Sequence, residues 1–515
     1  MDGRFVSACF GAGVVRAAAP AFVAAAALAA FAPTLGSERL TDAVRAGDAA
    51  AVSALLRQGA SGHAEDADGT TALHWAVRAD DVELARALLR AGAHARAANR
   101  YGVTPLALAA ENGNAAMMTL LLDAGADPSA AAGEGETVLM TAARTGRPEA
   151  VKLLLAHGAD PNATERAFGE TALMWAAGHG HADAIRALAA GGAKLDAHAA
   201  TIDLPPTKVN FSFAVTTALP RGGMTALMYA AREGQLDAAT ALAEAGADLN
   251  AVDPEGTTAL VIAIINAHYD VAARLVEEGA DPNIGDTAGM AALYAAVDMV
   301  HMAPFVNRPS PRASGSLSSA DLVTVLLEHG ANPNAALRAP LLMRQHNGGD
   351  PSLGNGATPL MRAAKAADVA LMQTLLDHGA DPSRAMANGN TALLVAVSGR
   401  AGSLTPDAPM FQAVQLLLDR GAGVNAAASN GETLLHRGVV RGEAFVRMLV
   451  QRGARVDLKD AGGRTPLDVA LGVPPPAPVG RGPGAGGPPG GPGGAPAGAD
   501  DATIGLLREL GAPRG

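Results

Sequence analysis

A glycine recurs along this chain at a nearly fixed interval, each time ahead of two apolar runs, the second of which ends in Gly-Ala. The intervals are 33, 33, 34, 54, 33, 33, 67, 33, 42 and 32 residues. The glycines are Gly69, Gly102, Gly135, Gly169, Gly223, Gly256, Gly289, Gly356, Gly389, Gly431 and Gly463. A period near 33 indicates a stack of small units, each burying its apolar face only against its neighbours.

A stack of this kind presents a long surface and no enclosed pocket, which favours a binding protein over an enzyme. Hydrophobic residues make up 49% of the 515 residues and aromatic residues only 3%, so the core must be built from small and aliphatic side chains. The formal net charge is −11 and there is no basic tract. We therefore expect no nucleic-acid partner, because contacts to phosphates supply most of the affinity of such complexes.

The first 35 residues differ in character from the rest of the chain. Arg4 and Arg16 lie near the start, residues 17–32 are apolar and alanine-rich, and an A-x-A site lies at 27–29 within this run. This layout is typical of a secretory signal peptide, with an uncleaved N-terminal anchor as the alternative. Together with the strong preference for arginine over lysine, it predicts a bacterial protein that is periplasmic or secreted. No membrane span is expected after this segment.

Residues 135–168 illustrate one unit. Thr137 is placed to cap a first helix, and Gly146 ends that helix. Pro148 stands where a second helix starts, since its missing N–H costs nothing there. Gly158 is placed to end the second helix in the left-handed conformation. Each unit is therefore predicted to be a helix, a turn, a second helix and a hairpin-like finger.

Three segments now show a resemblance to a known family. TPLALAAENG at 104–113, LLLAHGADPN at 153–162 and TALMWAAGHGH at 171–181 resemble the ankyrin repeat. The resemblance implies an all-α repeat solenoid of about 12 ankyrin repeats in a curved stack. It also implies that fingers and first helices line a concave face, which holds another protein.

The period locates several interruptions. The ankyrin repeat array is predicted over 36–471, with inserted loops near 199–222, 300–319, 336–355 and 400–409. A Pro/Gly-rich tract at 472–499 cannot bury enough apolar surface to fold and is predicted to be a disordered insertion. Residues 500–515 then supply the second helix of the last repeat as a C-terminal cap.

Two of the insertions extend fingers, which border the concave face in the family. The first contains Lys208, Phe211 and Phe213 within an alternating pattern that predicts a strand, and the second contains Arg338, Arg344 and His346. We expect the two loops to flank a cleft. The alternative is that they only pack on the fingers beneath them.

No motif for catalysis, a cofactor or a metal is present. The chain lacks HExxH, a P-loop lysine and G-x-S-x-G, and its only cysteine, Cys9, lies in the N-terminal segment. His179 and His181 are interpreted as structural, because no third or fourth ligand accompanies them. We therefore expect no enzyme activity, no cofactor and no metal.

The resemblance implies that partner contacts come from finger tips and from the exposed ends of first helices. Residues at these places are Arg100, Tyr101, Glu111, Asn112, Arg144, Phe168, His179, Arg232 and Glu233. The expected function is a monomeric scaffold that binds another protein. An envelope spacer without a specific ligand and an enzyme with a site in the inserted loops are the alternatives.

Overall fold

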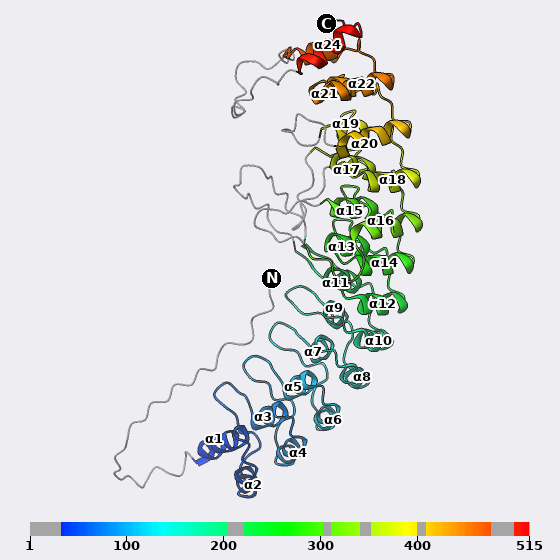
Figure 1. Cartoon of the computed structure of the whole chain (residues 1–515). Helices are drawn as coiled ribbons and strands as arrows, with labels where there is room; N and C mark the ends of the chain where they lie inside the picture. The colour runs from blue at the N-terminus through cyan, green and yellow to red at the C-terminus, as the bar shows by residue number, and fades with distance from the viewer. Residues whose placement is uncertain are drawn as a thin grey trace, which may run out of the picture.

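The computed structural model describes residues 32–202, 221–301, 311–339, 352–398, 408–474 and 499–513. This part of the chain contains 24 α-helices, which follow one another in antiparallel pairs (Figure 1). The all-α repeat solenoid predicted from the sequence is confirmed. Within these residues, no helix is both long and apolar enough to span a bilayer.

The helices fall into two sets. The first helices of the pairs are α1 (Ala32–Arg45), α3 (Ala72–Arg78), α5 (Pro105–Asn112), α7 (Val138–Arg144), α9 (Ala172–Gly178), α11 (Ala226–Glu233), α13 (Ala259–Ile265), α15 (Ala292–Val300), α17 (Pro359–Ala366), α19 (Ala392–Ala396), α21 (Leu434–Gly438) with the 3-10 helix η1 (Val439–Arg441), and α23 (Pro466–Ala470). The second helices are α2 (Ala49–Arg57), α4 (Val82–Arg90), α6 (Ala115–Asp123), α8 (Pro148–Ala156), α10 (Ala182–Ala190), α12 (Leu236–Glu244), α14 (Tyr269–Glu277), α16 (Ser319–Glu328), α18 (Val369–Asp377), α20 (Ala408–Asp419), α22 (Glu443–Gln451) and α24 (Asp501–Glu509).

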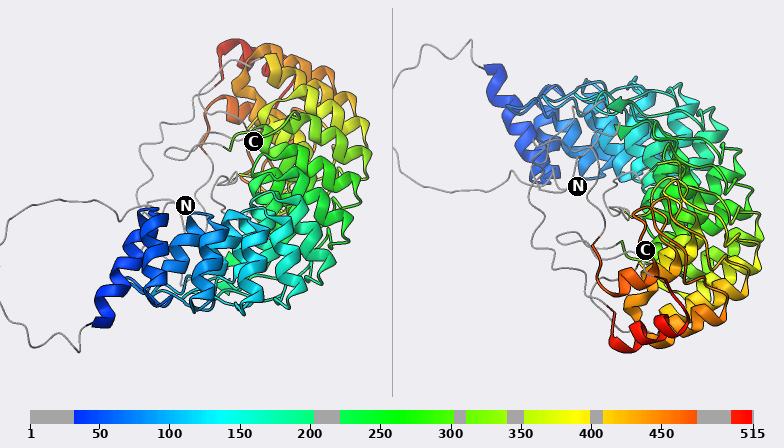
Figure 2. Two further views of the ribbon diagram at one scale, coloured as in Figure 1. Left: turned by 90° about the horizontal axis from the view of Figure 1, so that it is seen from below. Right: turned by 90° about the horizontal axis from the view of Figure 1, so that it is seen from above.

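The pairs stack into a curved array with three layers. Second helices form the outer layer, first helices the middle layer, and the fingers project from the inner side (Figure 1). We call each finger by the helices it joins, for example the α4–α5 finger. The array bends into an arc with α1 at one end and α24 at the other (Figure 2). Each pair therefore contacts only its neighbours along the arc.

Capping residues fix where the first helices begin. Thr137 accepts a hydrogen bond from the Met140 N–H at 3.2 Å, as predicted, and Thr104 caps α5 in the same way. Pro148 is the first residue of α8, and Gly158 ends that helix with a φ of 90°. Both assignments are confirmed. A cap supplies an acceptor to one of the N–H groups that the first turn leaves without a partner.

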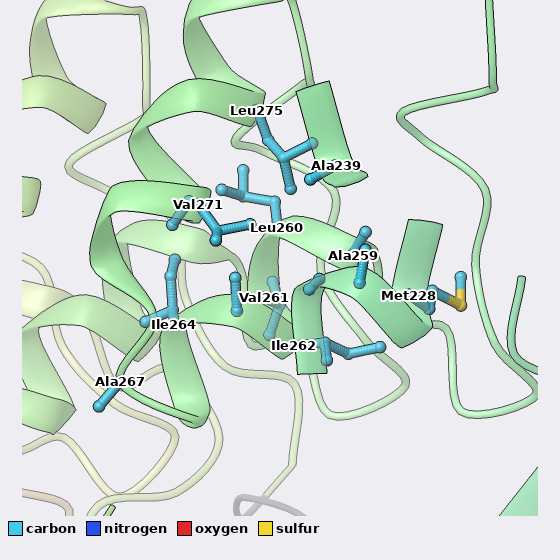
Figure 3. Close-up of a cluster of buried hydrophobic side chains, with 14 of the residues drawn as sticks. Met228, Ala239, Ala259, Leu260, Val261, Ile262, Ile264, Ala267, Val271 and Leu275 are labelled. Carbon is cyan, nitrogen blue, oxygen red and sulfur yellow. The ribbon is translucent and has the colours of Figure 1, made fainter. Parts of the chain in front are cut away.

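Aliphatic side chains fill the space between the helices, both within a pair and between consecutive pairs. In Figure 3, Leu260 and Ile264 of α13 lie beside Val271 of α14, and all three are buried. The same core continues along the stack from Leu40 to Leu507. Burying each such side chain contributes roughly 1.5–3 kcal/mol, so the array gains stability pair by pair.

Backbone hydrogen bonds join each finger to the next. Arg100 N–H donates to the Asp68 carbonyl at 2.9 Å, and Arg166 N–H donates to the Glu134 carbonyl at 2.9 Å. Ala461 N–H donates in the same way to the Asn430 carbonyl, next to Gly431. This finger ladder holds neighbouring fingers in close contact.

The ladder explains the recurring glycine. All eleven glycines named above have a φ between 66° and 89°, a conformation that L side chains rarely adopt. At Gly431 a Cβ would also lie 2.6 Å from the Ala461 nitrogen of the next finger. The period in the sequence is thus set by a turn that must be left-handed and, at Gly431, must also lack a side chain.

The structure gives three details at the expected boundaries. Helix α1 begins at Ala32, so Gly36 lies inside a helix and the predicted boundary at 35/36 does not coincide with the start of that helix. The 199–222 insertion begins and ends in a short ribbon, in which Thr201 pairs with Gly222 and Ile202 with Arg221, forming β1 (Thr201–Ile202) and β2 (Arg221–Gly222). Helix α20 starts at Ala408, inside the predicted 400–409 insertion.

A buried histidine occupies the third position of α3 and of α21, where α7 and α9 carry a methionine. His74 Nδ1 accepts from the Thr71 N–H at 3.1 Å, so its Nε2 carries the proton and donates to the Val103 carbonyl at 3.0 Å. His436 is held in the same way by Thr433. Burial lowers the pKa of both imidazoles, so the folded chain requires them to be neutral.

We predict that Gly431→Ala destabilises the protein more than Gly158→Ala does. Both glycines have positive φ, and an alanine there costs about 1–2 kcal/mol. Only at Gly431 does the new Cβ meet backbone, since nothing lies within 4 Å at Gly158. We expect Gly431→Ala to cost a further ~1–3 kcal/mol, measured as the lower midpoint of urea unfolding. Equal midpoints for the two variants would contradict the close approach of the fingers.

We predict that the double variant His74→Met and His436→Met loses less stability in acid than the wild type does. Methionine occupies the same helix position at Met140 and Met174, where its sulfur accepts from the capping threonine's N–H. Because the folded pKa of each histidine lies below the unfolded value of about 6.5, its stabilising effect is complete above that pH and is lost as the pH falls below it. Urea midpoints at about pH 7.5 and 5.5 measure the difference; an identical acid loss in both proteins would contradict the linkage.

Candidate functional site

The finger tips are held by side chains that accept backbone hydrogen bonds. Three residues before the opening glycine, Asn99 accepts from the Tyr101 N–H at 3.1 Å and from the Val103 N–H at 3.0 Å. Asp253 accepts from two N–H groups of its own finger in the same manner. A finger tip of this kind presents its outermost residue on a fixed backbone.

The α8–α9 finger contains one residue more than the fingers of uninterrupted 33-residue units, which accounts for the interval of 34 residues before Gly169. Its turn is held by Glu165, whose longer side chain spans the extra residue. The carboxylate accepts from the N–H groups of Ala167, Phe168 and Glu170 at 2.5, 2.8 and 3.0 Å. Glu165 is buried, with 6% of its surface exposed. The finger is therefore one residue longer than that of a 33-residue unit, and its turn is still held by side-chain hydrogen bonds.

Two aromatic residues occupy the tips of the α4–α5 and α8–α9 fingers, which are separated by the α6–α7 finger. Tyr101 and Phe168 directly precede opening glycines, and 57% and 53% of their surfaces are exposed. These are the highest exposures among the large hydrophobic residues that the structure describes. Arg100 lies 4.7 Å from the centre of the Tyr101 ring and donates to its hydroxyl at 2.5 Å. The three residues predicted at finger tips are thus located there, facing solvent.

Five of the residues predicted at first-helix ends are exposed. Glu111, His179, Arg232 and Glu233 are exposed, and Arg232 pairs with the adjacent Glu233 at 2.8 Å. Asn112 is also exposed, but its amide donates to the Val77 carbonyl of the preceding pair at 2.9 Å and so helps to join two pairs. His179 Nδ1 lies 2.9 Å from the carbonyl of Trp175 in its own helix.

Arginine side chains lie over aromatic rings along the inner side of the array. Arg45 lies 4.9 Å from the centre of the Trp75 ring, and Arg144 lies 6.0 Å from that of Trp175. Arg232 lies 4.8 Å from the ring of Tyr229. Such contacts are favourable electrostatically, and arginine, tryptophan and tyrosine are the residues most enriched at energetically dominant interface positions.

His181 has a structural role. Its Nε2 lies 2.9 Å from the Arg144 carbonyl of the preceding pair, and a Cβ on Gly146 would collide with its ring. It lines a shallow groove of about 260 Å³ together with Pro148 and Asp237. Among the residues that the structure describes, no group of three or more His, Cys, Asp or Glu side chains could hold a metal ion.

Most residues of the two finger insertions lie outside the described part of the chain. This applies to Lys208, Phe211, Phe213, Arg344 and His346. Arg338 is described: it is exposed, and its backbone N–H continues the finger ladder by donating to the Ala288 carbonyl at 2.8 Å. The cleft predicted between the two loops therefore stays a prediction.

Sequence reasoning missed a buried ion pair between α15 and α17. Arg362 Nε donates to Asp298 at 2.5 Å, and its Nη2 donates to the His301 carbonyl at 2.9 Å. Burial lowers the pKa of His301, as does the nearby Arg362, although Asp368 lies 3.2 Å from its Nε2. The sequence carried one signal for this ion pair: Arg362 stands at a position that the other first helices mostly fill with an apolar or aromatic residue. These contacts join two pairs on either side of an insertion.

We predict that Glu165→Ala loosens the α8–α9 finger and lowers stability by about 1–3 kcal/mol, because three partly buried N–H groups lose their acceptor. Hydrogen–deuterium exchange at Ala167, Phe168 and Glu170 should accelerate. Glu134→Ala, which removes an exposed carboxylate from the preceding finger, is the matched control and should change stability by less than about 0.5 kcal/mol. Unchanged exchange in Glu165→Ala would show that the carboxylate does not hold the turn.

Comparison with known families gives two matches. A family model described as ankyrin repeats in three copies matches residues 40–132, 129–199, 209–286, 227–302 and 313–405. A second model, for the single ankyrin repeat, matches residues 388–429. A comparison with curated proteins gave no match. Since the matches cover well over half of the sequence and the structure repeats the helix pair and finger throughout, the chain belongs to the ankyrin-repeat family.

Proposed function

We propose that the chain is a non-enzymatic, monomeric scaffold that binds a partner protein through its finger tips and the ends of its first helices. Ankyrin repeats generally mediate protein–protein interaction. The observation that carries the choice of face is the exposure of Tyr101 and Phe168 on tied finger tips. We also retain the prediction, made from the N-terminal segment, that the protein works in the periplasm or outside the cell.

A rigid finger is a favourable place for a partner contact. Association costs conformational entropy for every loop or side chain that becomes ordered. The backbone at Tyr101 is fixed by Asn99 and that at Phe168 by Glu165, so little of this cost remains for either finger. Large aromatic side chains that are already exposed also lose contact with water when a partner covers them.

The proposal also includes the two finger insertions. Both leave the array from fingers: the first between β1 and β2, the second after Arg338. We include Lys208, Phe211 and Phe213 of one loop, and Arg344 and His346 of the other, in the proposed partner-binding surface. Their contribution would add to that of the finger tips and the first-helix residues Glu111, Arg144 and Arg232.

We predict that the double variant Tyr101→Ala and Phe168→Ala weakens partner binding at least about tenfold, because each aromatic anchor at an interface contributes more than about 1 kcal/mol. The partner is first isolated by crosslinked affinity capture on the full chain. Its dissociation constant is then measured by titration calorimetry against wild type and variant.

The matched control is Leu236→Ala with Leu510→Ala. Each of these residues is 38% exposed and lies on or next to a second helix, α12 or α24, away from the finger tips. This variant should bind like the wild type. Equal affinity of the Tyr101→Ala and Phe168→Ala variant and the wild type would contradict the proposed face, and capture of no partner would favour a spacer.

A further inference from the structure

The chain's two tryptophans occupy equivalent places in two different pairs. Trp75 in α3 and Trp175 in α9 each lie four residues after the capping threonine of their helix. Each ring faces the arginine that ends the preceding first helix, Arg45 of α1 or Arg144 of α7. The protein therefore contains the same arginine–tryptophan arrangement twice.

At the first place a carboxylate completes the arrangement. The Trp75 Nε1–H donates to Asp66 Oδ2 at 2.9 Å, and Arg45 Nη2 contacts the same oxygen. A single carboxylate oxygen is thus held by an indole N–H and a guanidinium. Hydrogen bonds to charged acceptors are among the stronger ones in proteins.

At the second place the carboxylate is missing. The Trp175 Nε1–H is shielded from water and has no hydrogen-bond partner in the described part of the chain. Glu165 stands at the finger position that corresponds to Asp66, but its carboxylate is occupied by the three N–H groups of the longer finger. The nearest carboxylate to Arg144 is that of Glu136, at 3.8 Å, and it accepts a hydrogen bond from Thr141.

A buried donor without an acceptor costs free energy, and a native structure seldom leaves one without a reason. The loss here follows from the finger that also presents Phe168 to solvent. One change in the sequence, an extra residue and a glutamate in place of an aspartate, thus removes the internal acceptor beneath the finger that carries Phe168.

We infer that Arg144 and Trp175 bind a carboxylate of the partner, from an aspartate or glutamate side chain, in the manner in which Arg45 and Trp75 bind Asp66. This inference rests on the proposed function, and it adds the chemistry of the partner: an acidic residue next to an apolar one that covers Phe168. The Arg144 side chain is 38% exposed and so is open to an incoming anion. The indole N–H is buried, so the inferred contact requires the surrounding side chains to move as the carboxylate enters.

The test begins with a phage-displayed library of random dodecapeptides, panned on the full chain. Selected peptides should be enriched in aspartate and glutamate over the unselected library. For the tightest peptide, replacing its acidic residues by asparagine or glutamine should weaken binding about tenfold. Trp175→Phe and Arg144→Gln should each remove most of this discrimination between the acidic peptide and its amide counterpart.

Trp75→Phe is the matched control, because its indole N–H is already satisfied by Asp66. It should retain the discrimination. It also leaves Trp175 as the only tryptophan, since the chain has two. In this variant the single indole ¹H–¹⁵N cross-peak should move downfield with the acidic peptide and stay in place with the amide peptide, a readout that does not require Trp175 to be mutated.

The outcomes separate the two proposals. Peptides that bind without acidic preference, or an acidic preference that persists in Trp175→Phe and Arg144→Gln, would overturn the inference and leave the proposed function standing. An indole cross-peak that does not respond to the acidic peptide would overturn it as well. A library that yields no binder to the full chain would count against the proposed function itself.

Discussion

The contact between one helix pair and the next is the interaction on which the rest of the structure depends. No pair can bury its aliphatic face alone, and the finger ladder can form only when two fingers approach as closely as Gly431 and Ala461 do. This single requirement accounts for the left-handed glycines, the small side chains of the core and the even curvature of the array. It also explains why insertions are tolerated at several places, since each interrupts a connection and leaves the contact between neighbours intact.

The same contact produces a surface suited to binding. Fingers that are tied to each other hold their tips in fixed positions, so Tyr101 and Phe168 are presented without the mobility that exposed loops usually have. Below the tips, arginines from one first helix lie over aromatic rings of its own helix or of the next one. A partner laid along this side would contact several pairs at once, and contacts spread over several pairs can make binding selective.

Local features could be predicted from the sequence, whereas contacts between pairs could not. Thr137, Pro148 and Gly158 were placed correctly because caps, first-turn prolines and left-handed glycines are determined by a few adjacent residues. The role of Glu165 could have been predicted, since the sequence shows both the interval of 34 residues and a glutamate at a position where several other fingers carry Asp or Asn. The pairing of Arg144 with Trp175, and of Arg362 with Asp298, depends on how consecutive pairs stack and required the structure.

The central claim is that fingers and first helices form the binding face. Hydrogen–deuterium exchange on the full chain, with and without a saturating captured partner, tests it most directly. The account predicts slower exchange in the α4–α5 and α8–α9 fingers and at the ends of α7 and α9, with no change in the second helices α6, α8 and α10. Protection confined to those second helices, with the fingers unaffected, would contradict it.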